Sequence, residues 1–373
     1  MKKVSVLFLI GIGFLFFGIG PVSAATITGT APVVYTNIEA LNDALSVAIG
    51  EAFDDAIAEA NDTLSIYRDQ QDLARGFGNA NAYSSQVATF QGFQNYSRIA
   101  VTSGVMVGVQ APSTDPDYYK NLDDRIRHDG DLFAGVGAGV SFFNVGINAK
   151  SIHPGLYLNF KFGSLSIKPT DEAKVSNTII GAGVNYTLIK PKSGSFLFKW
   201  RGLSVGSGLI YHTSKVTYKL ELDPLTEDFT ASSGIYDIDG QVVIDPSVNL
   251  EVNVKTLTVP FDITTSAQAL WLFNLTLGAG LDFNLGKTDI LLISNGSVTI
   301  GDDLDTPPGV DIDSITPGMV HVDGSTTGVS PSFSRLRLMT GLGFNFGPAK
   351  IDIPIIYYLK SGVSAGVTVG VVL

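Results

Sequence analysis

Histidine is the residue in this sequence best suited to acid–base or metal chemistry, because cysteine is absent. No histidine stands in an H-E-x-x-H pair or beside a G-x-S-x-G nucleophile elbow. A serine–histidine pair assembled from different strands remains an alternative, with His212 as its best partner. We expect no enzymatic activity, no cofactor and no metal site. We interpret all four histidines as residues of loops or strand ends; they are His128, His153, His212 and His321.

Glycines alternate from Gly135 to Gly139, which superficially suggests a loop that cradles phosphate. Such a loop needs a G-x-G-x-x-G sequence that opens onto a helix, and none follows here. Residues two apart share one face of a β-strand. The alternation therefore predicts the small face of a strand.

Composition and charge exclude further classes of protein. With 45% hydrophobic and 16% charged residues the chain is too apolar to be disordered. A net charge of −11 without clustered cations excludes a nucleic-acid partner. The stretch 301–331 contains aspartates but no lysine or arginine. A Ca²⁺ site is an alternative there, but EF-hand ligand spacing is absent, and we predict a solvated acidic loop.

Several charged side chains interrupt segments whose residues otherwise alternate between apolar and small or polar. If these segments cross a membrane, lipid penalises a charge by about 2–4 kcal/mol at the midplane, so the charges must point inward. We predict that a lumen is lined by Lys161, Lys219, Glu251, Lys255, Asp282, Arg335 and Arg337.

Two of these charges suggest what fills the lumen. Arg335 and Arg337 are two residues apart and so share a strand face. They are expected either to line a water-filled channel or to pair with an acidic N-terminal helix acting as a plug. Asp54, Asp55 and Glu59 are the candidate carboxylates of that plug helix. In the alternative, the helix lies in the periplasm or assembles with itself.

The first segment is a targeting signal. Residues 1–24 comprise a cationic start at Lys2 and Lys3, an apolar run, and small residues that end at Ala24. This is the pattern of a secretory signal peptide, and we predict cleavage after Ala24. An uncleaved anchor is the alternative. No second apolar run of about 18 residues follows, so a helical inner-membrane protein is not expected.

The segment 25–96 is predicted to be an N-terminal helical region. From residue 37 to residue 75 apolar residues recur at steps of three and four, which indicates one long amphipathic helix. Its other face is acidic and therefore does not seek an anionic lipid surface. The following stretch, 77–94, is rich in Ala, Asn, Gln and Ser and is compatible with helix or coil.

Beyond Arg98 the hydrophobic period changes to two, as in strands. Between Phe273 and Gly286, for example, every second residue is apolar and the others are small or polar. The segments are long enough for tilted membrane strands, and their second face suits a barrel lumen better than open water. We predict that residues 97–373 form a transmembrane antiparallel β-barrel; a soluble sandwich is the alternative.

Periodicity places ten strands outside residues 195–247, and that region must add an even number if both barrel termini lie in the periplasm. Either two runs there supply two strands, or one long strand, 196–222, is joined by a run near Tyr236. We predict about twelve strands, within a range of 10–14. The stretches 111–130, 163–175 and 301–331 are expected to lie outside the cell, with short turns in the periplasm.

From Arg98 to Leu373 the chain resembles bacterial outer-membrane β-barrels, including an amphipathic final strand, although Leu373 replaces the usual terminal aromatic residue. The segment before the barrel resembles the N-terminal hatch of fatty-acid-transporter barrels, but it lacks an Asn-Pro-Ala motif and its helix is longer. A weaker similarity, carried by residues 73–82 and 101–110, is to spirochaete-type surface-antigen barrels. Neither resemblance transfers functional residues.

We therefore expect a protein of the bacterial outer membrane that contacts lipid and the barrel-assembly machinery. The leading hypothesis is passive passage of small solutes, hydrophobic or polar, or of an amphipathic ligand through a barrel gated by its N-terminal segment. The alternative is a surface antigen or adhesin whose acidic exterior loops bind host or cell-surface molecules. The sequence leaves the solute and the oligomeric state open.

Overall fold

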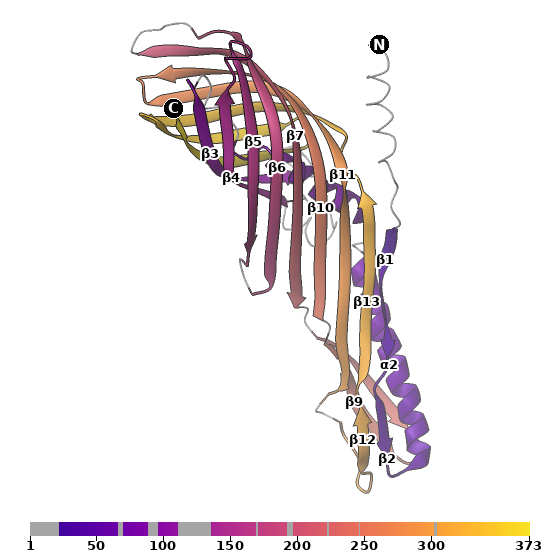
Figure 1. Ribbon diagram of the computed structural model, residues 1–373. Coiled ribbons are helices and arrows are strands. Elements are labelled where there is room, and N and C mark those ends of the chain that lie inside the picture. Colours follow the sequence, from indigo (N-terminus) through magenta and orange to yellow (C-terminus); the bar gives the residue numbers. More distant parts are fainter. Residues whose placement is uncertain are drawn as a thin grey trace, which may run out of the picture.

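The computed structural model describes residues 22–65, 70–88, 96–110, 136–168, 171–191, 197–221, 224–245, 247–301 and 304–373. The predicted signal segment up to residue 21, His128, Gly135, Asp302 and Asp303 lie outside these residues. The chain forms a closed barrel and a smaller module that projects from one end of it (Figure 1).

The barrel is a closed antiparallel ring. Each strand pairs with its neighbours in the order β11-β10-β7-β6-β5-β4-β3-β16-β15-β14, and β14 returns to β11 through pairs from Phe273↔Phe344 to Phe283↔Ser334. The ring strands are β3 (Ile99–Gln110), β4 (Val136–Asn148), β5 (Leu156–Ile167), β6 (Ala173–Ile189), β7 (Phe198–Glu221), β10 (Ser247–Ala269), β11 (Phe273–Ile300), β14 (Ser334–Phe346), β15 (Ala349–Tyr358) and β16 (Gly362–Val372). The predicted fold class is confirmed.

The ring has ten strands rather than the expected twelve, for two reasons. The segments 270–285 and 289–300 are one strand, β11, which continues through Gly286. That glycine has a φ of +152°, and a side chain there would meet the Lys255 carbonyl. In addition, the region 195–247 gives only β7 to the ring, because its second half forms a separate hairpin, β8 and β9.

The projecting part, which we call the module, has its own apolar core. It consists of the far half of β11 with β1 (Val22–Thr30), β2 (Val33–Thr36), α2 (Glu39–Ser65), β8 (Leu225–Ser232), β9 (Asp237–Asp245), β12 (Ile312–Thr316) and β13 (Gly318–Val329). The Thr36 hydroxyl accepts a hydrogen bond from the Ile38 amide at 3.2 Å at the start of α2. The apolar face of α2, with Leu41, Leu45 and Phe53, packs into a core shared with β8 and β9.

A second helix, α3 (Gln70–Ser84), crosses the barrel lumen (Figure 1). It contacts strands from around the ring: β3, β4, β7, β10, β11 and β16. Beyond it the chain reaches β3 at the end of the barrel that also holds the C-terminus, where the Arg98 amide donates to the Leu373 carbonyl at 2.8 Å. We call this end the turn end and the opposite one the module end.

The barrel has its apolar side chains on the outside. On β14, Leu336, Leu338 and Leu342 are 58%, 52% and 60% exposed, whereas Arg337 between them is 1% exposed. Exposed apolar residues of this kind occur on every ring strand. This is the reverse of a soluble protein and the arrangement of a barrel wall that faces lipid. Neither of the described helices has the length and hydropathy needed to cross a membrane.

Candidate functional site

The lumen wall is shaped to receive α3 at close range. A Cβ added at Gly108 on β3 would lie 2.5 Å from the Ala80 carbonyl oxygen and 3.0 Å from the Ser84 amide nitrogen. One added at Gly139 on β4 would meet the Ser84 carbonyl. Because Gly108 and Gly139 have no side chains, the backbone of α3 can rest directly on the wall. Gly139 lies in strand β4, as the alternation of glycines predicted.

Tyr83 anchors one side of α3. Its ring stacks on Tyr358 of β15 with centroids 3.7 Å apart and planes 16° apart. Its hydroxyl donates to Gln110 Oε1 at 3.0 Å and is also hydrogen-bonded to the Ser361 hydroxyl. Asn79, one turn earlier, donates to the same Gln110 oxygen at 3.1 Å. The helix is thus tied to the wall beside the β15–β16 turn.

His212 and Asn81 anchor the opposite side. Asn81 Nδ2 donates to Thr256 Oγ1 at 2.9 Å and to the His212 carbonyl at 3.2 Å. His212 Nδ1 donates to the Asn81 carbonyl at 2.8 Å, and its Nε2 lies 2.5 Å from the Asn177 amide. Nδ1 therefore helps to seat α3 and Nε2 binds strand β6, and among the described residues neither nitrogen is paired with a serine. His212 holds a structural position in the lumen.

The turn that follows α3 is held by polar groups of the wall. Lys161 Nζ donates to the Ser85 carbonyl at 3.0 Å. The Ala88 carbonyl accepts from Thr102 Oγ1 at 3.0 Å and from Asn144 Nδ2 at 2.5 Å. Hydrogen bonds thus hold α3 and the turn after it to the wall from Asn79 to Ala88.

A buried ionic cluster lies on β10, β11 and β14, next to Tyr358. Arg337, whose side chain has no exposed surface, has its Nε 3.1 Å from Asp282 Oδ1 and its Nη2 3.4 Å from Asp262 Oδ2. Arg335 lies nearer the module end and donates to Ser332 Oγ at 2.5 Å. The structure therefore places Lys161, Asp282, Arg335 and Arg337 inside the barrel. Arg337 pairs with carboxylates of the wall strands, whereas Arg335 contacts Ser332 and the Tyr83 hydroxyl of α3.

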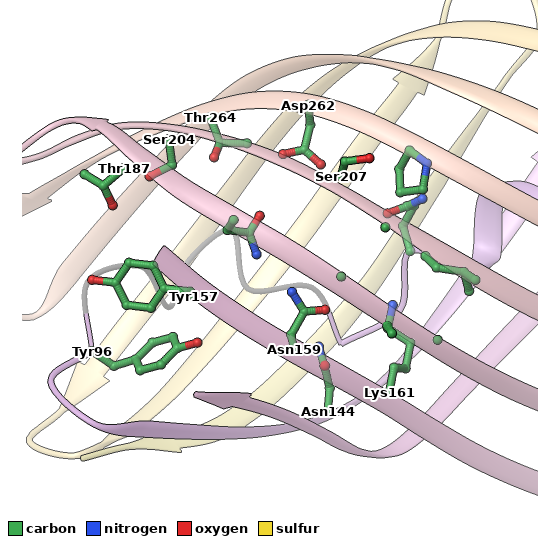
Figure 2. Close-up of a pocket in the computed structure, with 18 residues that line it drawn as sticks. Tyr96, Asn144, Tyr157, Asn159, Lys161, Thr187, Ser204, Ser207, Asp262 and Thr264 are labelled. Atoms are coloured by element: carbon green, nitrogen blue, oxygen red, sulfur yellow. The ribbon is translucent and has the colours of Figure 1, made fainter. Parts of the chain in front are cut away.

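A polar cavity of about 90 Å³ lies between the turn after α3, at Gln86, and the wall strands (Figure 2). It is lined mainly by amides and hydroxyls, including Asn159, Ser204 and Thr264. At one side of the cavity the rings of Tyr96 and Tyr157 pack edge to face, with their centroids 4.9 Å apart. Burial raises the pKa of the Tyr96 hydroxyl. Two atoms of the residues that line the cavity, Gln86 Nε2 and Asn144 Oδ1, have no hydrogen-bond partner among the described residues. Such atoms indicate a hydrated space.

Comparison with known proteins assigns the chain to a family. The Lsa36-like family matches residues 24–373. The chain belongs to the Lsa36-like family. A search of curated proteins finds no match for this Lsa36-like protein.

The Lsa36-like chain is also similar, at low identity, to solved barrel structures. One is the translocator domain of the autotransporter NalP from Neisseria meningitidis, with 10% identity, a TM-score of 0.30, and coverage of 79% of this chain and 99% of that one. Another is the toluene transporter TbuX from Ralstonia pickettii, with 8% identity, a TM-score of 0.26, and coverage of 83% and 97%. The CymD monoaromatic hydrocarbon channel has 10% identity, a TM-score of 0.26, and coverage of 79% and 94%.

Three residues expected in the lumen of the Lsa36-like barrel lie on its outer face instead. Lys219 and Lys255 are exposed, and Glu251 pairs with Lys215 at 2.8 Å. The reason is a change of solvent along β10. Near the module end water replaces lipid outside, so Val252 and other apolar residues turn inward and pack on the start of α3. The rule that charges face inward fails there.

The prediction that the acidic N-terminal helix fills the lumen was also wrong. Asp54, Asp55 and Glu59 are exposed on α2, which belongs to the module and faces away from Arg335 and Arg337. Large aliphatic residues on α2 require an apolar core, which the polar lumen cannot supply. The small polar run from Gly78 to Tyr83 fits the lumen instead. Its richness in Ala and Asn was the available signal in the sequence.

Proposed function

We propose that this Lsa36-like protein is an outer-membrane channel for small polar solutes and that α3 closes it. The observation that carries the proposal is the inversion of polarity across the barrel wall, with apolar residues outside and a hydrogen-bonding lumen inside that holds a helix. A ring of ten strands is wider than the eight whose side chains fill their own interior. A plug is therefore needed to block the passage of water.

The contacts that seat α3 suit a plug that can leave its seat. Besides the apolar contacts of Ala74 and the stacking of Tyr83, residues Asn79, Asn81 and Tyr83 attach to the wall by hydrogen bonds. Each such bond contributes about 0.5–1.5 kcal/mol net, because water can replace it. Release of α3 would then expose a hydrated path lined by amides, hydroxyls and charged groups. This lining favours polar over hydrophobic solutes.

A disulfide that fixes α3 to the wall tests whether α3 closes the channel. The Cβ of a residue at position 78 would lie 3.3 Å from the Pro331 Cβ, close to the range of about 3.5–4.5 Å in disulfides, and the only nearer atom is the Thr288 side-chain hydroxyl. The native chain has no cysteine, so Gly78→Cys with Pro331→Cys, made together with Tyr83→Leu, introduces the only pair. We expect little conductance in planar bilayers when the pair is oxidised and frequent openings after reduction, because reduction frees a helix that has also lost its tyrosine anchor.

The two single-cysteine variants are the controls, and their conductance should not respond to reductant. High conductance in the oxidised double variant would show that α3 does not close the lumen. Silence in every form, before and after reduction, would contradict the channel.

A second candidate function is binding by the exterior of the protein. It is favoured by the module, which has a core of its own and exposes Tyr35 and Met319 at 51% and 71%. In this reading the barrel is an anchor with a permanent plug. Silent bilayers together with binding of cell-surface molecules to liposomes that carry the protein would support it over the channel.

A further inference from the structure

The N-terminal part of the chain lies at the module end of the barrel. Strand β1 pairs with β13 from Val22↔Thr326 to Thr30↔Met319. Strand β13 in turn pairs with β11 between Thr288 and Val298, beyond the stretch of β11 that closes the ring on β14. The start of the described chain and its C-terminal residue are therefore at opposite ends of the barrel.

Contacts along α3 show that the chain enters the lumen from the module end. Ala74 packs with Val252 and Val254 at the junction with the module. Further along the chain, Asn79 contacts Ser332 and then Asn81 contacts His212. Each later contact lies deeper in the barrel.

The chain leaves the lumen at the turn end. After the Ser85 contact with Lys161, Asn148 donates to the Tyr96 carbonyl at 3.0 Å. The Arg98 amide then donates to the Leu373 carbonyl, and β3 begins. The described residues 70–88 and 96–98 thus extend from one end of the barrel to the other.

The lengths of the connections indicate which end faces the exterior. At the turn end strands are joined by short segments, such as 270–272 and 347–348. At the module end 168–172 and 359–361 are short, but the connections 111–135, 222–246 and 301–333 are long, and the last two build the module. In outer-membrane barrels short turns face the periplasm and long connections face outward. On this basis the module end is exterior.

Resting on the proposed outer-membrane location, we propose that the chain crosses the membrane through its own barrel and displays its N-terminal strand and α2 at the cell surface. This replaces the expectation that the N-terminal helix lies in the lumen or the periplasm. The exposed carboxylates of α2, such as Asp54 and Asp55, exclude a route through hydrocarbon. The segment therefore reaches the exterior through the lumen or as the ring closes around α3.

Single cysteines in this cysteine-free chain test the topology in intact cells. The variants are Asp54→Cys on α2, Lys360→Cys in the β15–β16 turn at the module end, and Ser151→Cys in the turn end, all at exposed positions. Each is treated with a membrane-impermeant maleimide before and after permeabilisation. A periplasmic protein with a free cysteine reports on cell integrity.

We expect Asp54→Cys and Lys360→Cys to label as fully on intact cells as after permeabilisation, and Ser151→Cys to label only afterwards. Labelling of Lys360→Cys without Asp54→Cys would overturn the display of the N-terminal segment and leave the channel proposal standing. Labelling of Ser151→Cys alone would overturn the orientation. Labelling of none of them on intact cells would overturn surface display altogether. The bilayer conductance is measured separately, so its failure is distinct from all of these.

Discussion

Replacing Leu338 with arginine is expected to destabilise the protein in a bilayer by about 2–4 kcal/mol, the cost of a cation on the lipid face near the midplane. Leu338 lies on the outer face of β14, is 52% exposed and pairs with Ala279 and Tyr357 of the neighbouring strands. Urea unfolding in lipid vesicles, followed by the gel mobility of the folded barrel, measures the change.

The matched control is Val47→Arg. Val47 is also an exposed apolar residue, at 61%, but it lies on α2 in the module, where water surrounds the surface. It should change the free energy of unfolding by no more than about 0.5 kcal/mol, as surface substitutions usually do. Equal, small effects at both positions would mean that the outer face of the barrel does not contact lipid.

Replacing Arg337 is expected to lower the free energy of unfolding by more than the substitution of Leu338 does. Arg337→Met leaves the Asp282 and Asp262 carboxylates without their buried partner, and breaking a buried ion pair in this way costs about 3–5 kcal/mol. The methionine keeps much of the volume, so the loss reflects the unpaired charge rather than a cavity. The same unfolding measurement reports it.

A triple variant separates charge from packing. Arg337→Met combined with Asp282→Asn and Asp262→Asn leaves no buried charge in this cluster. It should recover most of the stability lost in the single variant, because neutral replacement of a buried ion cluster is often tolerated. If the triple variant is as unstable as Arg337→Met, the cluster is not held together by charge.

The fold was predictable because the two sides of a barrel strand meet different surroundings. The alternation from Phe273 onward predicted both the strand and its faces, since Leu275 and Leu277 are exposed to the outside while Thr276 is buried toward the lumen. The same argument identified Arg337 and Asp282 as inward residues. Their partners were not predictable, because register between strands distant in the sequence leaves no trace in periodicity.

The rest of the site depends on where lipid gives way to water, and one sequence does not mark that boundary. Along β10 the pattern that points Thr256 into the lumen also points Val252 inward, so a rule based on polarity misplaced Glu251 and Lys255. The plug was misassigned for a related reason. The acidic helix with the strongest periodicity found its own core in the module, and the weaker run around Asn81 entered the barrel.

The most direct test of the account is the environment of β14 in a bilayer. Nitroxide labels on single cysteines at Leu336, Leu338, Leu342 and Met339 are compared for relaxation by oxygen, which concentrates in lipid, and by a water-soluble nickel chelate. We predict strong relaxation by oxygen alone at the three leucines, and weak relaxation by either reagent at Met339, which is 2% exposed inside the barrel. Relaxation of the leucine labels by the nickel chelate, or the same response at all four positions, would contradict a barrel whose apolar face meets lipid.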